Sequence, residues 1–133
     1  LDKLCATADQ CRIRLGSLEP RIITEEFCQA LKHHKNLCPH FHLSLQSGCD
    51  ATLKRMNRHY TAGEYYEKVQ ILREVFERPA ITTDVIVGFP GETEEDFLET
   101  LDVVPEAYGL CKRIDASTIT SADFIVGSWI NSI

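Results

Sequence analysis

The sequence lacks long apolar runs and clusters of basic residues. No stretch approaches the roughly 20 consecutive apolar residues that span a bilayer, and no signal peptide opens the chain, so we expect a cytoplasmic protein that does not enter a membrane. Lys and Arg together number 14 against 20 Asp and Glu, which gives a formal net charge of -6. Because binding to a phosphate backbone depends on clustered cations, this acidic segment is not expected to bind nucleic acid by itself.

Closely spaced cysteines are also missing. The six cysteines stand at positions 5, 11, 28, 38, 49 and 111. No two of them lie within the two or three residues that separate the ligands in zinc and iron-sulfur motifs. We therefore expect free thiols in a reducing compartment and no metal site built by this segment.

One stretch dominates what is present, TTDVIVGFPGETEEDF at residues 82–97. Three β-branched residues at 85–87 predict a buried strand. The glycines at 88 and 91 predict a turn, and Thr93 is placed to cap a helix whose acidic first turn complements the helix dipole. A strand that ends in a glycine-rich turn at a helix N-terminus is a common ligand site in α/β proteins, although an ordinary connecting loop has the same pattern.

Two further strand-and-helix units precede this stretch. Residues 12–17 and 40–46 alternate apolar and polar side chains, as half-buried strands do. Helical spacing of apolar residues predicts a helix over residues 24–35, capped by Thr24, and a second over residues 61–78. The second opens with a capping-box pair, a threonine and a glutamate three residues later, and its predicted buried stripe is Tyr65, Val69, Leu72 and Phe76. Between them, Asp50 is placed to cap a short helical turn. With 44% hydrophobic residues in 133, the chain has enough apolar material for the core of one domain.

Three successive units of this kind imply parallel strands joined by right-handed crossovers. Strands that are covered on both faces read as nearly continuous apolar runs, whereas these strands carry an alternate polar set. If the apolar set faces the helices, the opposite face holds Arg14, His42, Ser44, Gln46 and Asp84. That face is then the lumen of a TIM-like barrel, of which three units make an open arc with two uncovered strand edges; an exposed sheet face is the alternative. The predicted fold class is α/β.

The wording of three segments resembles a known family. Residues 12–27 read RIRLGSLEPRIITEEF and residues 40–61 read HFHLSLQSGCDATLKRMNRHYT. Together with residues 82–97, they are similar to the central part of the radical S-adenosylmethionine (radical SAM) methylthiotransferases. The LGSLEP and LQSGCD wording is most similar to the MtaB type, which acts on threonylcarbamoyladenosine in tRNA. The likeness covers about residues 12–102.

The resemblance implies a partial (β/α)6 barrel, the radical SAM core, of which this chain would form the third, fourth and fifth units. The family holds one 4Fe-4S cluster on a CxxxCxxC loop after the first strand and a second cluster on a preceding domain, and a small C-terminal TRAM domain helps to bind tRNA. None of the six cysteines here matches those ligands. Cys49 lies in the LQSGCD wording, and we expect it to be a packing residue rather than a ligand.

The cofactor implied by the resemblance is S-adenosylmethionine, and this arc would supply part of its binding surface. Polar groups at the strand ends are expected to meet its amino-acid and ribose parts, Arg58 its carboxylate, and the glycine turn its adenine. The predicted cofactor-binding residues are Ser17, Glu19, Ser44, Gln46, Arg58, Asp84, Gly88 and Gly91. No catalytic nucleophile or acid-base pair is expected, because the reactive chemistry belongs to the cofactor, and His42 is interpreted as a hydrogen-bonded interior histidine.

The likeness ends near Val103, and the third helix is expected to stop at Pro105. We interpret residues 1–104 as a partial radical SAM core and residues 105–133 as a divergent tail. The hypothesis for the tail is that its coding sequence is frameshifted or that the segment is disordered. Two other functions stay open. One is a βα remnant without ligand affinity, and the other is a barrel enzyme with a phosphate-bearing substrate at residues 88–93, although the charges near that loop are acidic.

Overall fold

The computed structural model describes residues 3, 5, 10–108 and 127–130. In chain order its elements are β1 (Ile13–Leu18), the 3-10 helix η1 (Pro20–Ile22), α2 (Glu25–Lys32), β2 (Leu37–Leu43), α3 (Asp50–Arg55), α4 (Ala62–Val75), β3 (Ala80–Val85), α5 (Glu94–Tyr108) and β4 (Gly127–Ile130). Within these residues, no helix is both long enough and apolar enough to cross a bilayer.

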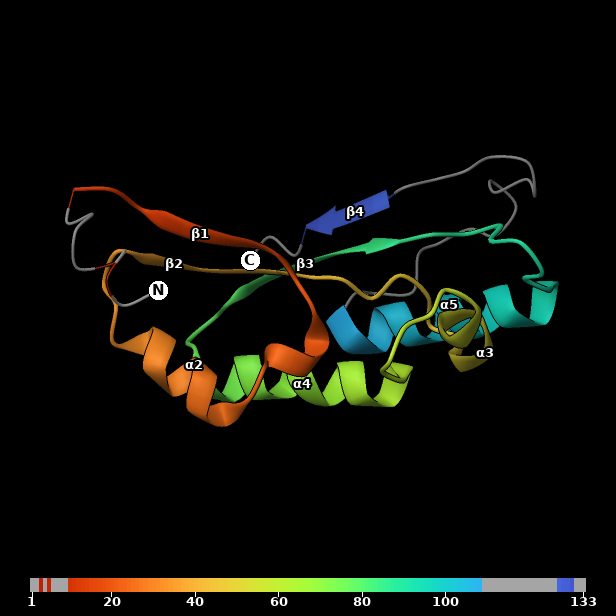
Figure 1. Cartoon of the computed structure of the whole chain (residues 1–133), viewed down its shortest axis with the longest axis horizontal. Coiled ribbons are helices and arrows are strands. Elements are labelled where there is room, and N and C mark those ends of the chain that lie inside the picture. The colour runs from red at the N-terminus through yellow and green to blue at the C-terminus, as the bar shows by residue number, and fades with distance from the viewer. Residues whose placement is uncertain (1–2, 4, 6–9, 109–126, 131–133) are drawn as a thin grey trace.

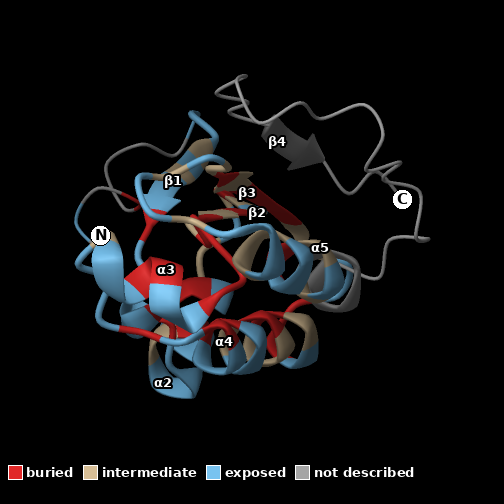
Figure 2. Ribbon diagram, turned by 90° about the vertical axis from the view of Figure 1, so that its right-hand side faces the viewer, coloured by how far each residue is buried: buried red, intermediate tan, exposed pale blue. Residues whose placement is uncertain are grey.

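The three strands β1, β2 and β3 are parallel neighbours in a sheet of order β1-β2-β3-β4. The helices lie together on one side of this sheet (Figure 1). Buried residues gather between the sheet and the helices, while the outer helix faces are exposed (Figure 2). The predicted α/β class, with three parallel strands in an open sheet, is therefore confirmed, and the arrangement is consistent with part of a TIM-like barrel.

The free edge expected at β3 is covered, which corrects the prediction of two uncovered edges. β4 pairs antiparallel with β3, from Thr82 opposite Ile130 to Val85 opposite Gly127. An unpaired edge leaves backbone N–H and C=O groups without partners, and an antiparallel strand satisfies them. The remainder of the predicted divergent tail, residues 109–126 and 131–133, lies outside the described residues.

Side-chain caps fix the starts of two helices as the sequence predicts. The Thr24 hydroxyl accepts a hydrogen bond from the Phe27 N–H at 3.1 Å at the start of α2. At the start of α4, the Thr61 hydroxyl accepts from the Glu64 N–H and the Glu64 carboxylate accepts from the Thr61 N–H, so that both bonds of the capping box form. Each cap satisfies N–H groups that a helix start otherwise leaves unpaired.

The core lies between the sheet and helices α2 and α4. The rings of Phe41 on β2 and Phe76 after α4 are 4.8 Å apart between centroids, and the Tyr65 hydroxyl donates to the Leu43 carbonyl at 3.0 Å. The predicted stripe of α4 is buried throughout: Tyr65, Val69, Leu72 and Phe76. Burial of such side chains contributes about 1.5–3 kcal/mol each, which makes this layer the main source of stability.

The predicted bounds of two strands are wrong. β2 covers Leu37–Leu43 and β3 covers Ala80–Val85, in each case earlier in the chain than residues 40–46 and 85–87. Backbone pairing sets these bounds, because Leu37 lies opposite Ile13 and Phe41 opposite Ile81. Apolar runs extend past the paired segment, so hydrophobicity alone marks the end of a strand poorly.

Two predicted helix signals also act differently from expectation. Asp50 does not cap α3, whose N-cap residue is Cys49; its carboxylate instead accepts the N–H of Ala62 at 2.8 Å and so supports the start of α4. Helix α5 continues through Pro105 to Tyr108. A proline inside a helix removes one hydrogen-bond donor, which bends or weakens the helix without always ending it.

The loop after β2 lies directly against α5. The Gly48 N–H donates to the Thr100 hydroxyl at 3.0 Å, and the Ser47 hydroxyl lies 3.1 Å from the same oxygen. A Cβ added at Gly48 would stand 2.7 Å from the Thr100 Cα atom. The backbones therefore approach at a distance that only glycine permits here.

An ion pair joins α3 to the first turn of α5. The Arg55 guanidinium lies 2.6 Å from the Asp96 carboxylate, which also accepts from the Cys49 thiol at 3.3 Å. The Arg55 hydrogen bond, with the Thr93 N–H second, lowers the pKa of Asp96 from 3.8 to about 2. Thr93 caps α5 as predicted, since its hydroxyl accepts from the Asp96 N–H at 3.2 Å.

We expect Gly48→Ala to destabilise the protein by about 1–3 kcal/mol, because its Cβ would meet helix backbone that has no room to move. Urea unfolding followed by circular dichroism measures the effect. The control is Gly63→Ala, whose Cβ would have its nearest neighbour, the Thr61 hydroxyl, at 3.9 Å. Equal unfolding midpoints for Gly48→Ala and wild type would contradict the close contact.

Asp96→Asn should lower the thermal midpoint near neutral pH by removing the charge that pairs with Arg55. Because the folded pKa of Asp96 lies below its ordinary value of 3.8, the stabilisation is complete above about pH 4 and is lost as the pH falls towards about 2. The difference between wild type and variant should shrink over that window. Glu95→Gln, an exposed position in the same turn, serves as the control, and a pH-independent difference would refute the linkage.

Candidate functional site

Each of the three parallel strands ends near a residue with a positive φ angle. These residues are Ser17 (φ 53) in β1, Gln46 (φ 69) after β2 and Gly88 (φ 74) after β3. Glycine adopts this conformation freely, whereas serine and glutamine are strained in it. The pairing shifts between Leu15 and Leu18, so that Leu18 turns into the core past Ser17. All three belong to the predicted site and lie at the carboxyl edge of the sheet.

Gln46 and Asp84 are brought together as predicted. The Gln46 N–H donates to the Asp84 carbonyl at 3.0 Å, and the Gln46 carbonyl accepts from the Ile86 N–H at 2.8 Å. Gln46 is only 9% exposed. Its side-chain amide makes no hydrogen bond within the described part of the chain. The backbone of Gln46 is thus fixed, while its amide keeps its hydrogen-bonding capacity for another group.

Asp84 lies on the face of the sheet away from the helices, beside His42. Its carboxylate is 3.3 Å from His42 Nε2, and the side chain is 35% exposed. The other ring nitrogen of His42 lies 3.0 Å from the Thr82 hydroxyl. Both nitrogens of His42 therefore have partners, and its interpretation as a hydrogen-bonded interior histidine is confirmed. The second carboxylate oxygen of Asp84 has no partner among the described residues.

Ser44, Glu19 and Arg58 gather around Tyr60, a residue that the sequence reasoning did not single out. The Tyr60 hydroxyl donates to the Ser44 carbonyl at 2.9 Å, and the Ser44 N–H donates to the Leu18 carbonyl at 3.1 Å. Burial raises the pKa of Tyr60, the nearby Arg58 charge lowers it and the Glu19 charge raises it. The side chains of Glu19 and Arg58 are exposed.

The glycine turn after β3 is closed by Glu92. Its carboxylate accepts from the N–H groups of Gly88 and Phe89, and the Glu92 N–H donates to the Phe89 carbonyl at 2.8 Å. A Cβ at Gly88 would meet no atom within 4 Å, whereas one at Gly91 (φ 83) would lie 3.6 Å from the Arg55 side chain. The turn therefore has open space over Gly88 and protein beside Gly91.

Cys49 is buried and pairs with Asp96. It is 2% exposed, and burial raises the pKa of its thiol. The described residues hold no group of three or more His, Cys, Asp or Glu side chains able to bind a metal ion. Its thiol donates to Asp96, which agrees with the interpretation of Cys49 as a packing residue.

Sequence comparison gives a family for the chain. The profile of the Radical SAM superfamily matches residues 3–104. A protein from Desulfosudis oleivorans named tRNA-2-methylthio-N(6)-dimethylallyladenosine synthase is 52% identical over 93 residues, which are 70% of this chain and 20% of that protein. Threonylcarbamoyladenosine tRNA methylthiotransferase MtaB from Treponema pallidum is 52% identical over 88 residues, 66% of this chain and 18% of that protein.

The chain thus spans about a fifth of the length of the curated relatives that it matches. Members of the Radical SAM superfamily use S-adenosylmethionine and a 4Fe-4S cluster, and the matched region includes all three parallel strands and the turn at Gly88. The match covers most of the sequence and agrees with the observed α/β fold. The chain belongs to the Radical SAM superfamily.

Proposed function

We propose that this chain is part of a tRNA methylthiotransferase and that the carboxyl edge of its three parallel strands binds S-adenosylmethionine. The observation that carries the proposal is the positive φ angle at all three strand ends, including two residues that are not glycine. Strained backbone persists only where the surrounding structure enforces it, and it concentrates at functional sites.

The groups at this edge suit the polar parts of the cofactor. S-adenosylmethionine carries an ammonium, a carboxylate and a ribose diol, which together need acceptors and donors of hydrogen bonds. The unpartnered Gln46 amide supplies both, and the free oxygen of Asp84 is an acceptor for an ammonium or hydroxyl group. Their backbones are joined by a 3.0 Å hydrogen bond, so the two side chains leave neighbouring points of the sheet.

The remaining predicted residues surround this pair. Ser17, Glu19 and Ser44 stand at the ends of β1 and β2, and Arg58 adds a cation near Tyr60 that is able to meet a carboxylate. The open space over Gly88 allows a flat ring to approach the backbone of the turn. Gly91 has the Arg55 side chain beside it, so we assign it to the shape of the turn more than to contact with the cofactor.

When bound beside a reduced cluster, S-adenosylmethionine supplies the radical chemistry that activates an inert C–H bond, and the protein binds, orients and shields the reactants. The described residues hold no group of three or more His, Cys, Asp or Glu side chains able to bind a metal ion. In this proposal the 4Fe-4S clusters are held by parts of a longer protein outside this sequence. No acid-base pair is required from the strands.

The nucleoside substrate is part of the same proposal. Relatives named for a dimethylallyladenosine product and for threonylcarbamoyladenosine are equally similar at 52% identity, and the LQSGCD wording favours the MtaB type. Contact with tRNA is assigned to other parts of the longer protein, because this segment has a formal net charge of -6. A cytoplasmic location follows from a tRNA substrate.

Isothermal titration of the purified chain with S-adenosylmethionine should give saturable heat. Gln46→Ala and Asp84→Asn should each weaken binding about tenfold, the effect of losing one hydrogen bond to a charged group. The matched controls are Gln29→Ala on α2 and Asp102→Asn on α5, both at exposed positions, which should bind as wild type does.

Three outcomes would count against the proposal. Absence of heat with the folded wild-type chain would favour a βα remnant without ligand affinity. Heat with pyrophosphate alone would favour a phosphate-bearing substrate at residues 88–93. Equal losses in the control variants would mean that the strand ends are not the site.

A further inference from the structure

On the side of the sheet away from the helices, three side chains are joined by hydrogen bonds and Asp84 lies at ion-pair distance from the end of the series. His40 Nε2 lies 3.3 Å from the Thr82 hydroxyl, the same hydroxyl lies 3.0 Å from His42 Nδ1, and His42 Nε2 lies 3.3 Å from the Asp84 carboxylate. These residues alternate along β2 and β3 with the buried core residues Phe41, Leu43, Ile81 and Thr83. The series therefore runs across two strands and ends at a predicted cofactor residue.

The Asp84 carboxylate, 3.3 Å from His42 Nε2, selects one direction for this series when both rings are neutral. An ionised carboxylate only accepts, so His42 Nε2 carries the proton and His42 Nδ1 accepts. The single Thr82 hydroxyl proton is then donated to His42 Nδ1. The Thr82 oxygen in turn accepts from His40 Nε2–H, which leaves His40 Nδ1 as a bare acceptor.

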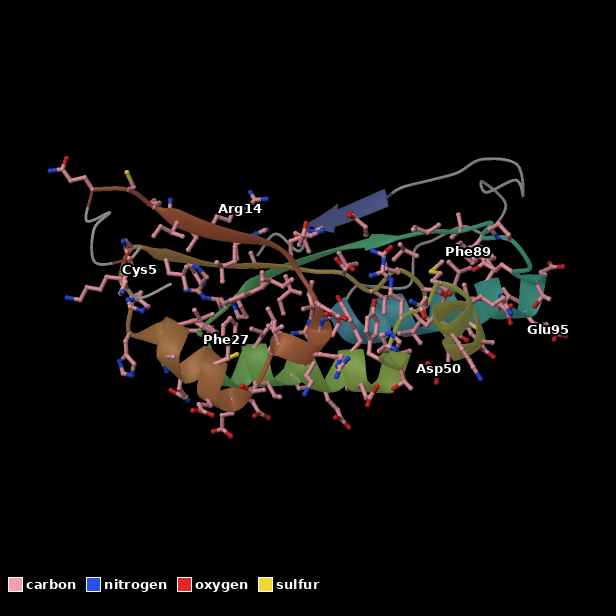
Figure 3. All side chains as sticks on the ribbon, viewed as in Figure 1. Cys5, Arg14, Phe27, Asp50, Phe89 and Glu95 are labelled. Atoms are coloured by element: carbon pink, nitrogen blue, oxygen red, sulfur yellow. The ribbon has the colours of Figure 1, made fainter. Side chains whose placement is uncertain are left out.

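The surroundings of His40 agree with this direction. Burial, the charge of Arg14 and that of His42 all lower the pKa of His40, which favours the neutral ring. Its Nδ1 atom is buried and has no hydrogen-bond partner among the described residues, as the ordering requires. Arg14 comes from β1 and projects on the side away from the helices (Figure 3), where its charge opposes a proton on His40.

We propose that His40, Thr82 and His42 form a directional relay that positions the Asp84 carboxylate, with one oxygen held by His42 and the other turned to a ligand group that donates a hydrogen bond. The ligand class is an ammonium or a hydroxyl. The identification of this ligand as S-adenosylmethionine rests on the proposed function, whereas the relay of His40, Thr82 and His42 does not. The three residues are positioning residues, because they act through Asp84 rather than on the ligand.

Long-range ¹H–¹⁵N spectra of the histidine-labelled chain, recorded above the histidine titration range, test the relay without any ligand. Both rings should carry the proton on Nε2. His42 Nδ1 should show the shift of a nitrogen that accepts a hydrogen bond, whereas His40 Nδ1 should show that of a free acceptor. Thr82→Val should move His42 Nδ1 to the free value, and Thr82→Ser, which keeps the hydroxyl, should restore the bonded value.

The control is Thr24→Val, which removes a helix cap on α2 and should leave both rings unchanged. A proton on His42 Nδ1 in the wild-type chain, or no response of His42 to Thr82→Val, would overturn the relay. If Thr82→Val does not fold, the wild-type and Thr82→Ser spectra still decide. In titrations with S-adenosylmethionine, Thr82→Val should weaken binding about three- to tenfold and Thr82→Ser should not. If the wild-type spectra agree with the relay but S-adenosylmethionine does not bind, the proposed function is wrong and the relay stands.

Discussion

Parallel pairing of β1, β2 and β3 is the constraint on which the rest of this structure depends. Parallel neighbours require a crossover after each strand, and all crossovers here lie on the same side of the sheet (Figure 1). One face is therefore covered by helices and the other is not. On the face without described helices, Thr82 hydrogen-bonds to His42, whose ring lies 3.3 Å from the Asp84 carboxylate.

The same pairing brings the strand ends to one edge, where backbone strain collects. A residue in a sparsely populated conformation costs of order 1–3 kcal/mol and needs support from its neighbours. Gln46 has that support from backbone hydrogen bonds to Asp84 in β3 and to Ile86 just after it. Ser17 has it from the burial of the next residue, Leu18, whose carbonyl accepts the Ser44 N–H. The strain is thus held by contacts that do not use the side chains of Ser17 or Gln46.

Local signals in the sequence predicted the elements better than their limits. The capping residues Thr24, Thr61 and Thr93 act as expected, because a cap depends only on residues within one helical turn. The bounds of β2 and β3 depend on the register with their neighbours, which no local pattern specifies. The predicted cap at Asp50 was wrong for the same reason, since its carboxylate accepts a hydrogen bond from the N–H of Ala62, 12 residues further along the chain.

The candidate site was predictable in part. Alternation placed His42 and Asp84 on one face, and the glycine turn was evident from the sequence. The partners that fix the site, Tyr60, Glu92 and Thr82, were missed because each acts through a contact with a segment that only the folded chain brings near, or through a backbone group. The sequence does contain a signal for Tyr60, because an aromatic residue with a hydroxyl group stands next to the helix cap Thr61. Such tyrosines are common in cores, so the signal does not by itself predict a place in the site.

Some residues of the family-like motifs stabilise the fold, and others keep side chains that are able to bind a ligand. In LQSGCD, Ser47 and Gly48 bind Thr100 of α5, and Cys49 donates to Asp96, so most of the motif joins the loop to the helix. Gln46 alone keeps a side chain with no partner in the described residues. A motif residue whose hydrogen bonds are already satisfied within the fold has little capacity left for a ligand. By that criterion, Gln46 keeps the capacity for a ligand that Ser47 and Cys49 of the same motif have used within the fold.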